Sequence, residues 1–200
     1  MQLFYSPTSP YARNCRVVAR ERGLMDRIEE RAVSPYDDPP ELLAANPLAR
    51  VPTLLRDDGS AVFDSPVICA YLDALSPGPA LIPDGPRRWD VLTREALADG
   101  ILDAAFAMVM ERRRPDPQQS PDWLARWAAA IVRSLDAVEA DIAGFGGDIT
   151  IAQLGLGAAL GYLDFRLPDL AWRTGRPQTE AWFEAFSTRE CMRETAPAAG

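Results

Sequence analysis

The spacing of apolar positions changes along the chain and divides it into two parts. In the first part, short apolar or alternating runs bounded by turn residues predict strands at 2–5, 28–33, 51–55 and 61–63. Helical spacing behind Ser, Asp and Pro start signals predicts helices at 9–23, 41–45 and 64–75. Because strands and helices alternate before a strand hairpin, this part is expected to be an α/β domain, a mixed sheet with helices on both faces.

The second part shows only helical spacing. Helices are expected at 87–114, 121–143, 151–166 and 180–186, and the helix at 151–166 is apolar nearly all round. Thr150 and Gln153 form a capping-box pattern that starts this buried helix. A segment rich in Pro and Gly separates the two parts. We therefore expect an α/β domain over 1–76, a linker over 77–86 and an all-helical domain over 87–200.

Composition removes several kinds of chemistry. The 200 residues include no His, and all 21 basic residues are Arg, because the sequence contains no Lys. A Ser-His-Asp triad, His ligands to a metal and a Schiff-base Lys are therefore excluded. Three well-separated Cys have no metal-ligand spacing and favour a reducing compartment, so we expect no metal. No long apolar segment or signal peptide is visible, which makes the cytoplasm the expected location and a membrane an unexpected partner. The net charge of −8 argues against nucleic acid.

Ser9 and Pro52 are the first two candidate site residues. Ser9 precedes Pro10 at a helix start, where free N–H groups and the helix dipole stabilise an anion such as a thiolate. Ser9 capping its own helix explains the same pattern. Pro52 enters a strand, where a cis peptide would turn the Val51 backbone toward a ligand, whereas a trans Pro starting an edge strand is the simpler alternative.

Asp64, Ser65 and Arg50 are the next candidates. Asp64 and Ser65 precede Pro66 at another helix start and together suit a zwitterion, with its ammonium on the carboxylate and its carboxylate on the hydroxyl and amides. Plain helix capping is the alternative. Arg50 suits a carboxylate through its planar guanidinium, although a solvated surface Arg is the alternative at any single position.

The order of these motifs resembles the cytosolic glutathione S-transferase superfamily, in its bacterial, Ser-type form. The resemblance rests on FYSPTSPYARNCRVVARERGL, then NPLARVPTLLRDDGSAVFDSPVICAYLD, then a helical half that is less specific. It implies a thioredoxin-like N-terminal domain that binds glutathione as co-substrate. It also implies an all-α C-terminal domain that supplies most of a pocket for a small hydrophobic electrophile. A homodimer is expected from the same resemblance.

The resemblance assigns roles to the motif residues. Ser9 would stabilise the glutathione thiolate, with Tyr5 on the first strand as the fallback. Arg50 would hold the glycyl carboxylate, and Val51 would pair its backbone with the cysteinyl part ahead of a cis Pro52. The γ-glutamyl end would be held by Asp64 and Ser65. The superfamily usually has an acidic residue at the position of Gln153, and Gln can still close the box.

The sequence leaves two questions open: which residues line the second-substrate pocket, and which reaction the protein catalyses. Tyr11 with Phe106, Met110 and Arg113 are candidates for the wall of that pocket, although core or dimer contacts explain Phe106 and Met110 equally well. The expected activity is conjugation of the glutathione thiolate to electrophiles. A glutathione-dependent disulfide reductase or isomerase uses the same glutathione site, and a non-catalytic binding or scaffold protein shares the fold.

Overall fold

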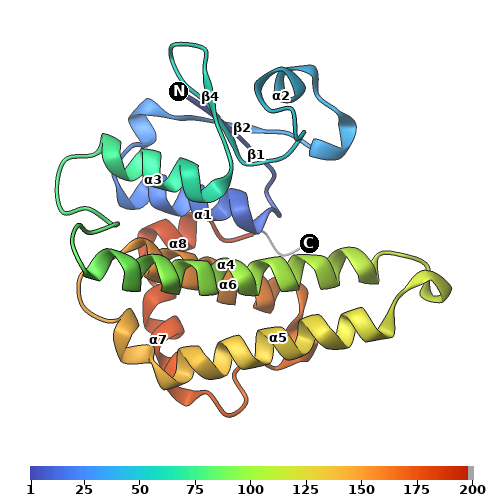
Figure 1. Ribbon diagram of the computed structural model, residues 1–200. Coiled ribbons are helices and arrows are strands. Elements are labelled where there is room, and N and C mark those ends of the chain that lie inside the picture. Colours follow the sequence, from blue (N-terminus) through green and yellow to red (C-terminus); the bar gives the residue numbers. More distant parts are fainter. Residues whose placement is uncertain (198–200) are drawn as a thin grey trace. The chain divides into compact units, whose positions relative to one another are not determined.

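The computed structural model describes residues 1–197 and divides into two compact units (Figure 1). The first unit holds residues 1–83 together with the described residues from 190 onward, and the second holds residues 84–189. This division differs from the expected one at the C-terminal end, because residues 190–197 group with the α/β part and not with the helical part.

A four-stranded mixed sheet forms the centre of the first unit. Its strands are β1 (Gln2–Tyr5), β2 (Glu29–Ala32), β3 (Thr53–Leu55) and β4 (Ala61–Val62). They are ordered β2-β1-β3-β4, with β1 parallel to β2 and the other pairs antiparallel. Leu3 and Leu54, both fully buried, stand opposite each other on β1 and β3. The expected mixed sheet is confirmed, although β3 begins two residues later than predicted.

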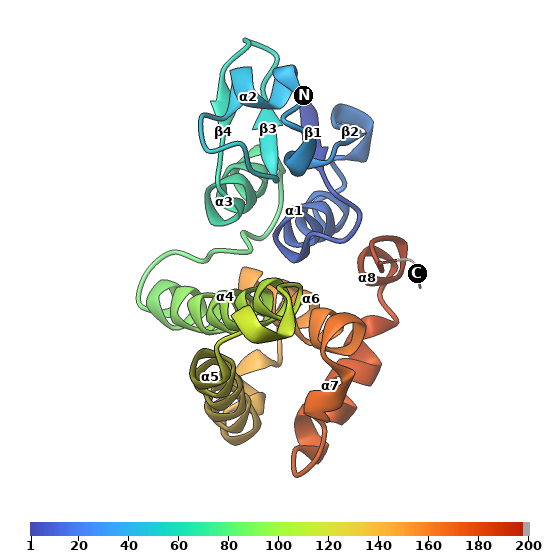
Figure 2. The ribbon, with the colours of Figure 1, turned by 90° about the vertical axis from the view of Figure 1, so that its right-hand side faces the viewer.

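Helices cover both faces of this sheet, as predicted. Helices α1 (Pro10–Glu21) and α3 (Ser65–Leu75) pack side by side on one face, and α2 (Pro40–Ala45) lies on the other (Figure 2). Helix α1 presents a continuous apolar side that includes Cys15, Val17 and Val18, all fully buried. The spacing of those residues fixes which side of α1 meets the sheet and α3.

A short helix that the sequence pattern missed, α8 (Glu190–Glu194), packs against α1. Arg13 Nη2 donates to the Met192 carbonyl at 3.2 Å, and Arg20 Nε lies 3.0 Å from Glu194 Oε2. Cys191 on α8 is only 4% exposed, because the packing of α8 on α1 covers that side chain.

Four helices form most of the second unit: α4 (Arg87–Arg112), α5 (Pro121–Ala140), α6 (Ile151–Arg166) and α7 (Pro177–Ser187). Helix α6 is buried over its first ten residues, as its apolar sequence predicted. The capping box is present, with the Thr150 backbone N–H donating to Gln153 Oε1 at 2.6 Å. Gln153 therefore closes the box as an acidic residue would.

Short 3-10 turns connect these elements, at Met25–Arg27, Pro35–Asp37, Asp116–Gln118, Ile142–Phe145 and Pro168–Leu170. Among residues 1–197, no helix combines the length and the apolarity that crossing a membrane requires.

Candidate functional site

Ser9 is the N-cap of α1. Its backbone is extended, with φ −77° and ψ 120°, and its Oγ accepts a hydrogen bond from the Ala12 N–H at 3.2 Å. A hydroxyl carries one donor and two acceptor positions, so this cap uses one acceptor and leaves the O–H group to donate. Ser9 can therefore cap its own helix and donate to an anion at the same time. Helix capping and anion binding, the two interpretations of Ser9 from the sequence, are therefore compatible.

Tyr5 ends β1 and faces α1. The Arg16 guanidinium carbon lies 4.4 Å from the Tyr5 ring centroid, and Arg16 donates two hydrogen bonds to Glu30, at 2.9 and 3.1 Å. Burial acts to raise the pKa of Glu30, but hydrogen bonds from Arg20 and Arg16 outweigh it and hold that pKa below its ordinary value. The Tyr5 ring therefore packs against an ion-paired Arg16.

The loop before β3 carries Arg50 and Val51. The Arg50 side chain is exposed, and the Val51–Pro52 peptide bond is cis. The Arg50 carbonyl accepts from Asn46 Nδ2 at 3.2 Å and from Thr53 Oγ1 at 2.8 Å. Sequence reasoning missed Asn46 and Thr53. An Asn before Pro indicates a helix stop, and no sequence signal distinguishes an exposed turn Asn from this buried one.

Asp64 and Ser65 begin α3. Asp64 occupies the N-cap position, yet its carboxylate makes no cap hydrogen bond and is exposed, so the capping interpretation of this side chain is wrong. The Phe63–Asp64 peptide bond is also cis. Ser65 is 3% exposed, and its carbonyl accepts a hydrogen bond from Cys15 Sγ at 3.7 Å. The Asp64 carboxylate is therefore not used by its own helix.

Strand pairing brings these three segments to one end of the sheet. Phe4, near the end of β1, pairs with Thr53 at the start of β3. Leu54 pairs with Val62, so the end of β4 also lies beside the start of β3. The chain leaves β1 toward Ser9, enters β3 from Val51 and leaves β4 toward Asp64. An anion-stabilising helix start, an exposed Arg and an exposed Asp thus share one edge of the first unit.

The predicted second-substrate residues lie in both units. Tyr11 belongs to α1 in the first unit. Phe106 and Met110 are one turn apart on α4, both partly exposed, and Arg113 follows at the end of that helix with Nη1 3.7 Å from Met110 Sδ. Within the second unit, Phe106 and Met110 on α4 and Arg113 at its C-cap therefore form one group along the helix.

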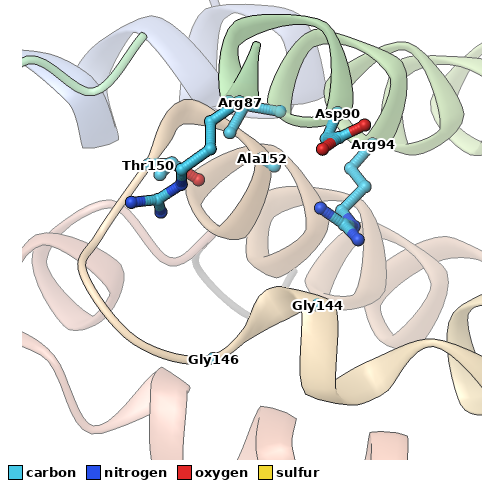
Figure 3. A pocket seen from close by; sticks show the side chains of 8 residues that line it. Arg87, Asp90, Arg94, Gly144, Gly146, Thr150 and Ala152 are labelled. Atoms are coloured by element: carbon cyan, nitrogen blue, oxygen red, sulfur yellow. The ribbon is translucent and has the colours of Figure 1, made fainter. Parts of the chain in front are cut away.

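The second unit contains a pocket, and none of the candidate site residues is among its lining residues (Figure 3). Arg94 crosses its wall, where its Nε donates to Asp141 Oδ2 at 2.8 Å. A Cβ at Gly144 would lie 2.3 Å from Arg94 Nη2, so a larger residue there would require the end of the Arg94 side chain to move. The charged residues that line the pocket are Arg87, Asp90 and Arg94, and its other lining residues include Gly146 and Thr150.

None of the cysteines is an accessible nucleophile. Cys15 and Cys69 are 0% exposed and Cys191 is 4% exposed, and all three are free thiols. Within residues 1–197, no group of three or more His, Cys, Asp or Glu is arranged to hold a metal ion. Thiol chemistry at this edge of the sheet would therefore need a thiol that is brought in by a ligand.

Comparisons with known proteins decide the family. Residues 3–80 match the model described as "Glutathione S-transferase, N-terminal domain", and residues 121–185 match the corresponding C-terminal domain. This chain belongs to the cytosolic glutathione S-transferase superfamily. The "uncharacterized GST-like protein YibF" of Escherichia coli K12 is 35% identical, over 98% of each chain.

Solved structures of this superfamily are similar over the whole chain. A glutathione transferase family member from Pseudomonas fluorescens Pf-5, crystallised with bound glutathione, has a TM-score of 0.95 and 40% identity over 98% of each chain. The maleylacetoacetate isomerase of Pseudomonas aeruginosa is 31% identical, but over only 50% of this chain and 48% of that protein. The first unit therefore has the thioredoxin-like fold of the superfamily, followed by its helical domain.

Proposed function

We propose that this transferase-family chain binds glutathione at the sheet edge of its first unit and conjugates the glutathione thiolate to small hydrophobic electrophiles. The observation that carries the proposal is the gathering of Ser9, Arg50 with Val51, and Asp64 with Ser65 at one end of the sheet. The solved relative with bound glutathione supports the choice of ligand.

The charges at this edge match the ends of glutathione. Arg50 binds the glycyl carboxylate, and the exposed Asp64 carboxylate binds the γ-glutamyl ammonium group. The Ser65 hydroxyl and the N-terminal amides of α3 bind the γ-glutamyl carboxylate, since a helix start stabilises a negative charge. The backbone of Val51, ahead of the cis Pro52, pairs with the cysteinyl part.

Ser9 activates the thiol in this proposal. A free cysteine thiol has a pKa of about 8.5, and lowering it by about two units requires roughly 2.7 kcal/mol. The α1 dipole and one hydrogen bond from Ser9 Oγ to a thiolate together reach that magnitude. The thiol proton passes to solvent, so no His is required. The thiolate then displaces a leaving group, or adds to an activated double bond, after which the carbanion formed on the substrate takes up a proton from water.

An isomerase is the second candidate, because a maleylacetoacetate isomerase is among the relatives. At the proposed site, an isomerisation would have the glutathione thiolate add to the substrate and later leave again, so that glutathione is not consumed. The same Ser9, Arg50, Asp64 and Ser65 serve both reactions. The buried state of all three cysteines disfavours a disulfide reductase that uses a cysteine of its own.

Immobilised glutathione tests the proposal first. The chain is expected to be retained and to elute with free glutathione, and the complex is expected to show thiolate absorbance in the ultraviolet at neutral pH. Turnover is then measured with a chloronitroaromatic, a maleyl ketone and hydroxyethyl disulfide, which separate transferase, isomerase and reductase. A chain that does not bind glutathione overturns the enzyme proposal and favours a scaffold protein.

We also propose a homodimer, with Tyr11, Phe106, Met110 and Arg113 contributing to the electrophile pocket. Light scattering is expected to give twice the chain mass of 22.0 kDa. A mass of one chain overturns the dimer.

A further inference from the structure

Asn46 is a buried amide whose hydrogen bonds all lie within one loop. It is 1% exposed, its Nδ2 donates to the Arg50 carbonyl at 3.2 Å and to Thr53 Oγ1 at 2.9 Å, and its Oδ1 accepts from the Leu48 N–H at 2.9 Å. Thr53 is 0% exposed and donates from Oγ1 to the same Arg50 carbonyl at 2.8 Å. Two buried side chains thus hold one backbone carbonyl.

That carbonyl shares a planar peptide unit with the Val51 N–H. In a trans peptide the C=O and N–H groups point in opposite directions, and the plane does not twist easily. Two donors on the Arg50 carbonyl therefore fix the direction of the Val51 N–H, which points away from Asn46 and Thr53. They also fix the position of the Arg50 Cα, which lies in the same plane and carries the side chain.

We infer that Asn46 and Thr53 are positioning residues for glutathione: they orient the Arg50–Val51 peptide so that it meets the cysteinyl part and Arg50 meets the glycyl carboxylate. The inference rests on the proposed function. Neither side chain has to touch the ligand, because each acts through the backbone between Asn46 and Thr53. Their effect is on glutathione binding, since the thiol is activated at Ser9 on a different segment.

Variants of the full-length chain separate the parts of this network. Asn46→Ala removes all three side-chain bonds. Asn46→Asp keeps an acceptor for the Leu48 N–H but puts a second acceptor oxygen where Nδ2 donates to the Arg50 carbonyl. Thr53→Val keeps the shape and removes the hydroxyl, and Thr53→Ser keeps the hydroxyl. Glutathione Kd by calorimetry, and KM for glutathione against kcat, are measured for each variant.

Asn46→Ala and Thr53→Val are expected to raise the glutathione Kd and KM by about tenfold, with kcat at saturating glutathione within about twofold of wild type. Thr53→Ser is expected to restore binding. Asn14→Ala is the matched control, because Asn14 is also 1% exposed but neither of its side-chain polar atoms has a described hydrogen-bond partner. Asn14→Ala is expected to leave the glutathione Kd unchanged.

Hydrogen exchange at the Leu48 amide reports on the loop without glutathione. Protection is expected to fall in Asn46→Ala and to persist in Asn46→Asp, although both variants bind glutathione weakly. If wild type binds glutathione and the folded Asn46→Ala and Thr53→Val variants bind it with the same Kd, the positioning role is overturned. The proposed function would then still stand. Equal losses of kcat and of glutathione affinity also overturn the positioning role. A wild type that does not bind glutathione overturns the proposed function and this inference with it.

Discussion

Cys15 Sγ and Cys69 Sγ lie 3.8 Å apart in the core, where α1 packs on α3. Cys15 also donates to the Ser65 carbonyl, at the start of α3. The helix that begins beside Ser9 and the helix that begins at Ser65 are therefore joined through one buried sulfur. The two ends of the proposed glutathione site depend on the same packing.

Cys15→Ala is expected to lower the free energy of unfolding by about 1–3 kcal/mol, because it removes buried volume and a hydrogen bond. Urea denaturation measures the loss. In the native protein a thiol reagent is expected to modify all three cysteines slowly, and in denaturant quickly, because only unfolding exposes them. Rapid labelling of Cys15 in the native chain would contradict the packing described.

Ser9→Ala is expected to remove the thiolate absorbance of the glutathione complex and to lower the free energy of unfolding by about 1 kcal/mol through loss of the cap. Ser120→Ala is the matched control. Ser120 also precedes a Pro and caps a helix, with the Trp123 N–H donating to its Oγ at 3.4 Å. It should reproduce the loss of stability and leave the thiolate band intact. If Ser9→Ala keeps the band and turnover, Tyr5→Phe is the next variant.

Arg50→Met is expected to raise KM for glutathione by about tenfold with little change in kcat, since the lost interaction holds the ground state and the transition state equally. Arg27→Met provides the comparison, because Arg27 is exposed in the same unit and lies outside the site. Initial rates at varied glutathione concentration measure both. If both substitutions changed KM for glutathione equally, Arg50 would not be a glutathione-binding residue.

Glu95 on α4 makes the stability of the chain depend on pH. Burial, with the nearby Asp99 charge, raises the pKa of Glu95 from 4.5 to about 7, and its Oε1 has no hydrogen-bond partner among the described residues. The folded chain therefore keeps a proton that the unfolded chain releases. Stability is expected to fall as pH rises from about 4.5 to about 7. Above pH 7 the loss of stability caused by Glu95 is expected to stay constant.

Glu95→Gln carries no charge at any pH. Its free energy of unfolding is expected to exceed that of wild type by up to about 3 kcal/mol at pH 8, with the difference shrinking toward zero near pH 4. Denaturation of both chains across this range measures it. A difference that does not change with pH would rule out a raised pKa at Glu95.

Local signals in the sequence were sufficient for most of the fold. The Ser9-Pro10 start and the Thr150 capping box each act within a few residues, so α1 and α6 begin where the pattern predicts. Helix α8 was missed because five residues carry too little periodicity. The helix is held against α1 by hydrogen bonds from Arg13 and Arg20, which lie more than 170 residues earlier in the chain.

The sequence was sufficient to propose the candidate site residues but not to find the residues that support them. Order and motif indicated Ser9, Arg50 and Asp64, and strand pairing brings their segments to one edge. No local pattern shows that the Asp64 carboxylate leaves its own helix uncapped. Local sequence patterns also do not show that the Asn46 side chain turns inward and donates to the Arg50 carbonyl, because that hydrogen bond depends on the path of the whole loop.

The contact between α8 and α1 has a consequence for synthesis. Arg13 is buried, and burial together with the neighbouring Arg16 lowers its pKa to about 10, so it stays charged at neutral pH. Its acceptor, the Met192 carbonyl, follows the whole helical unit in the sequence. The first unit therefore cannot complete its packing until the helical unit has been synthesised. The unit that starts first finishes last, after the helical unit that lies between its two pieces in the sequence.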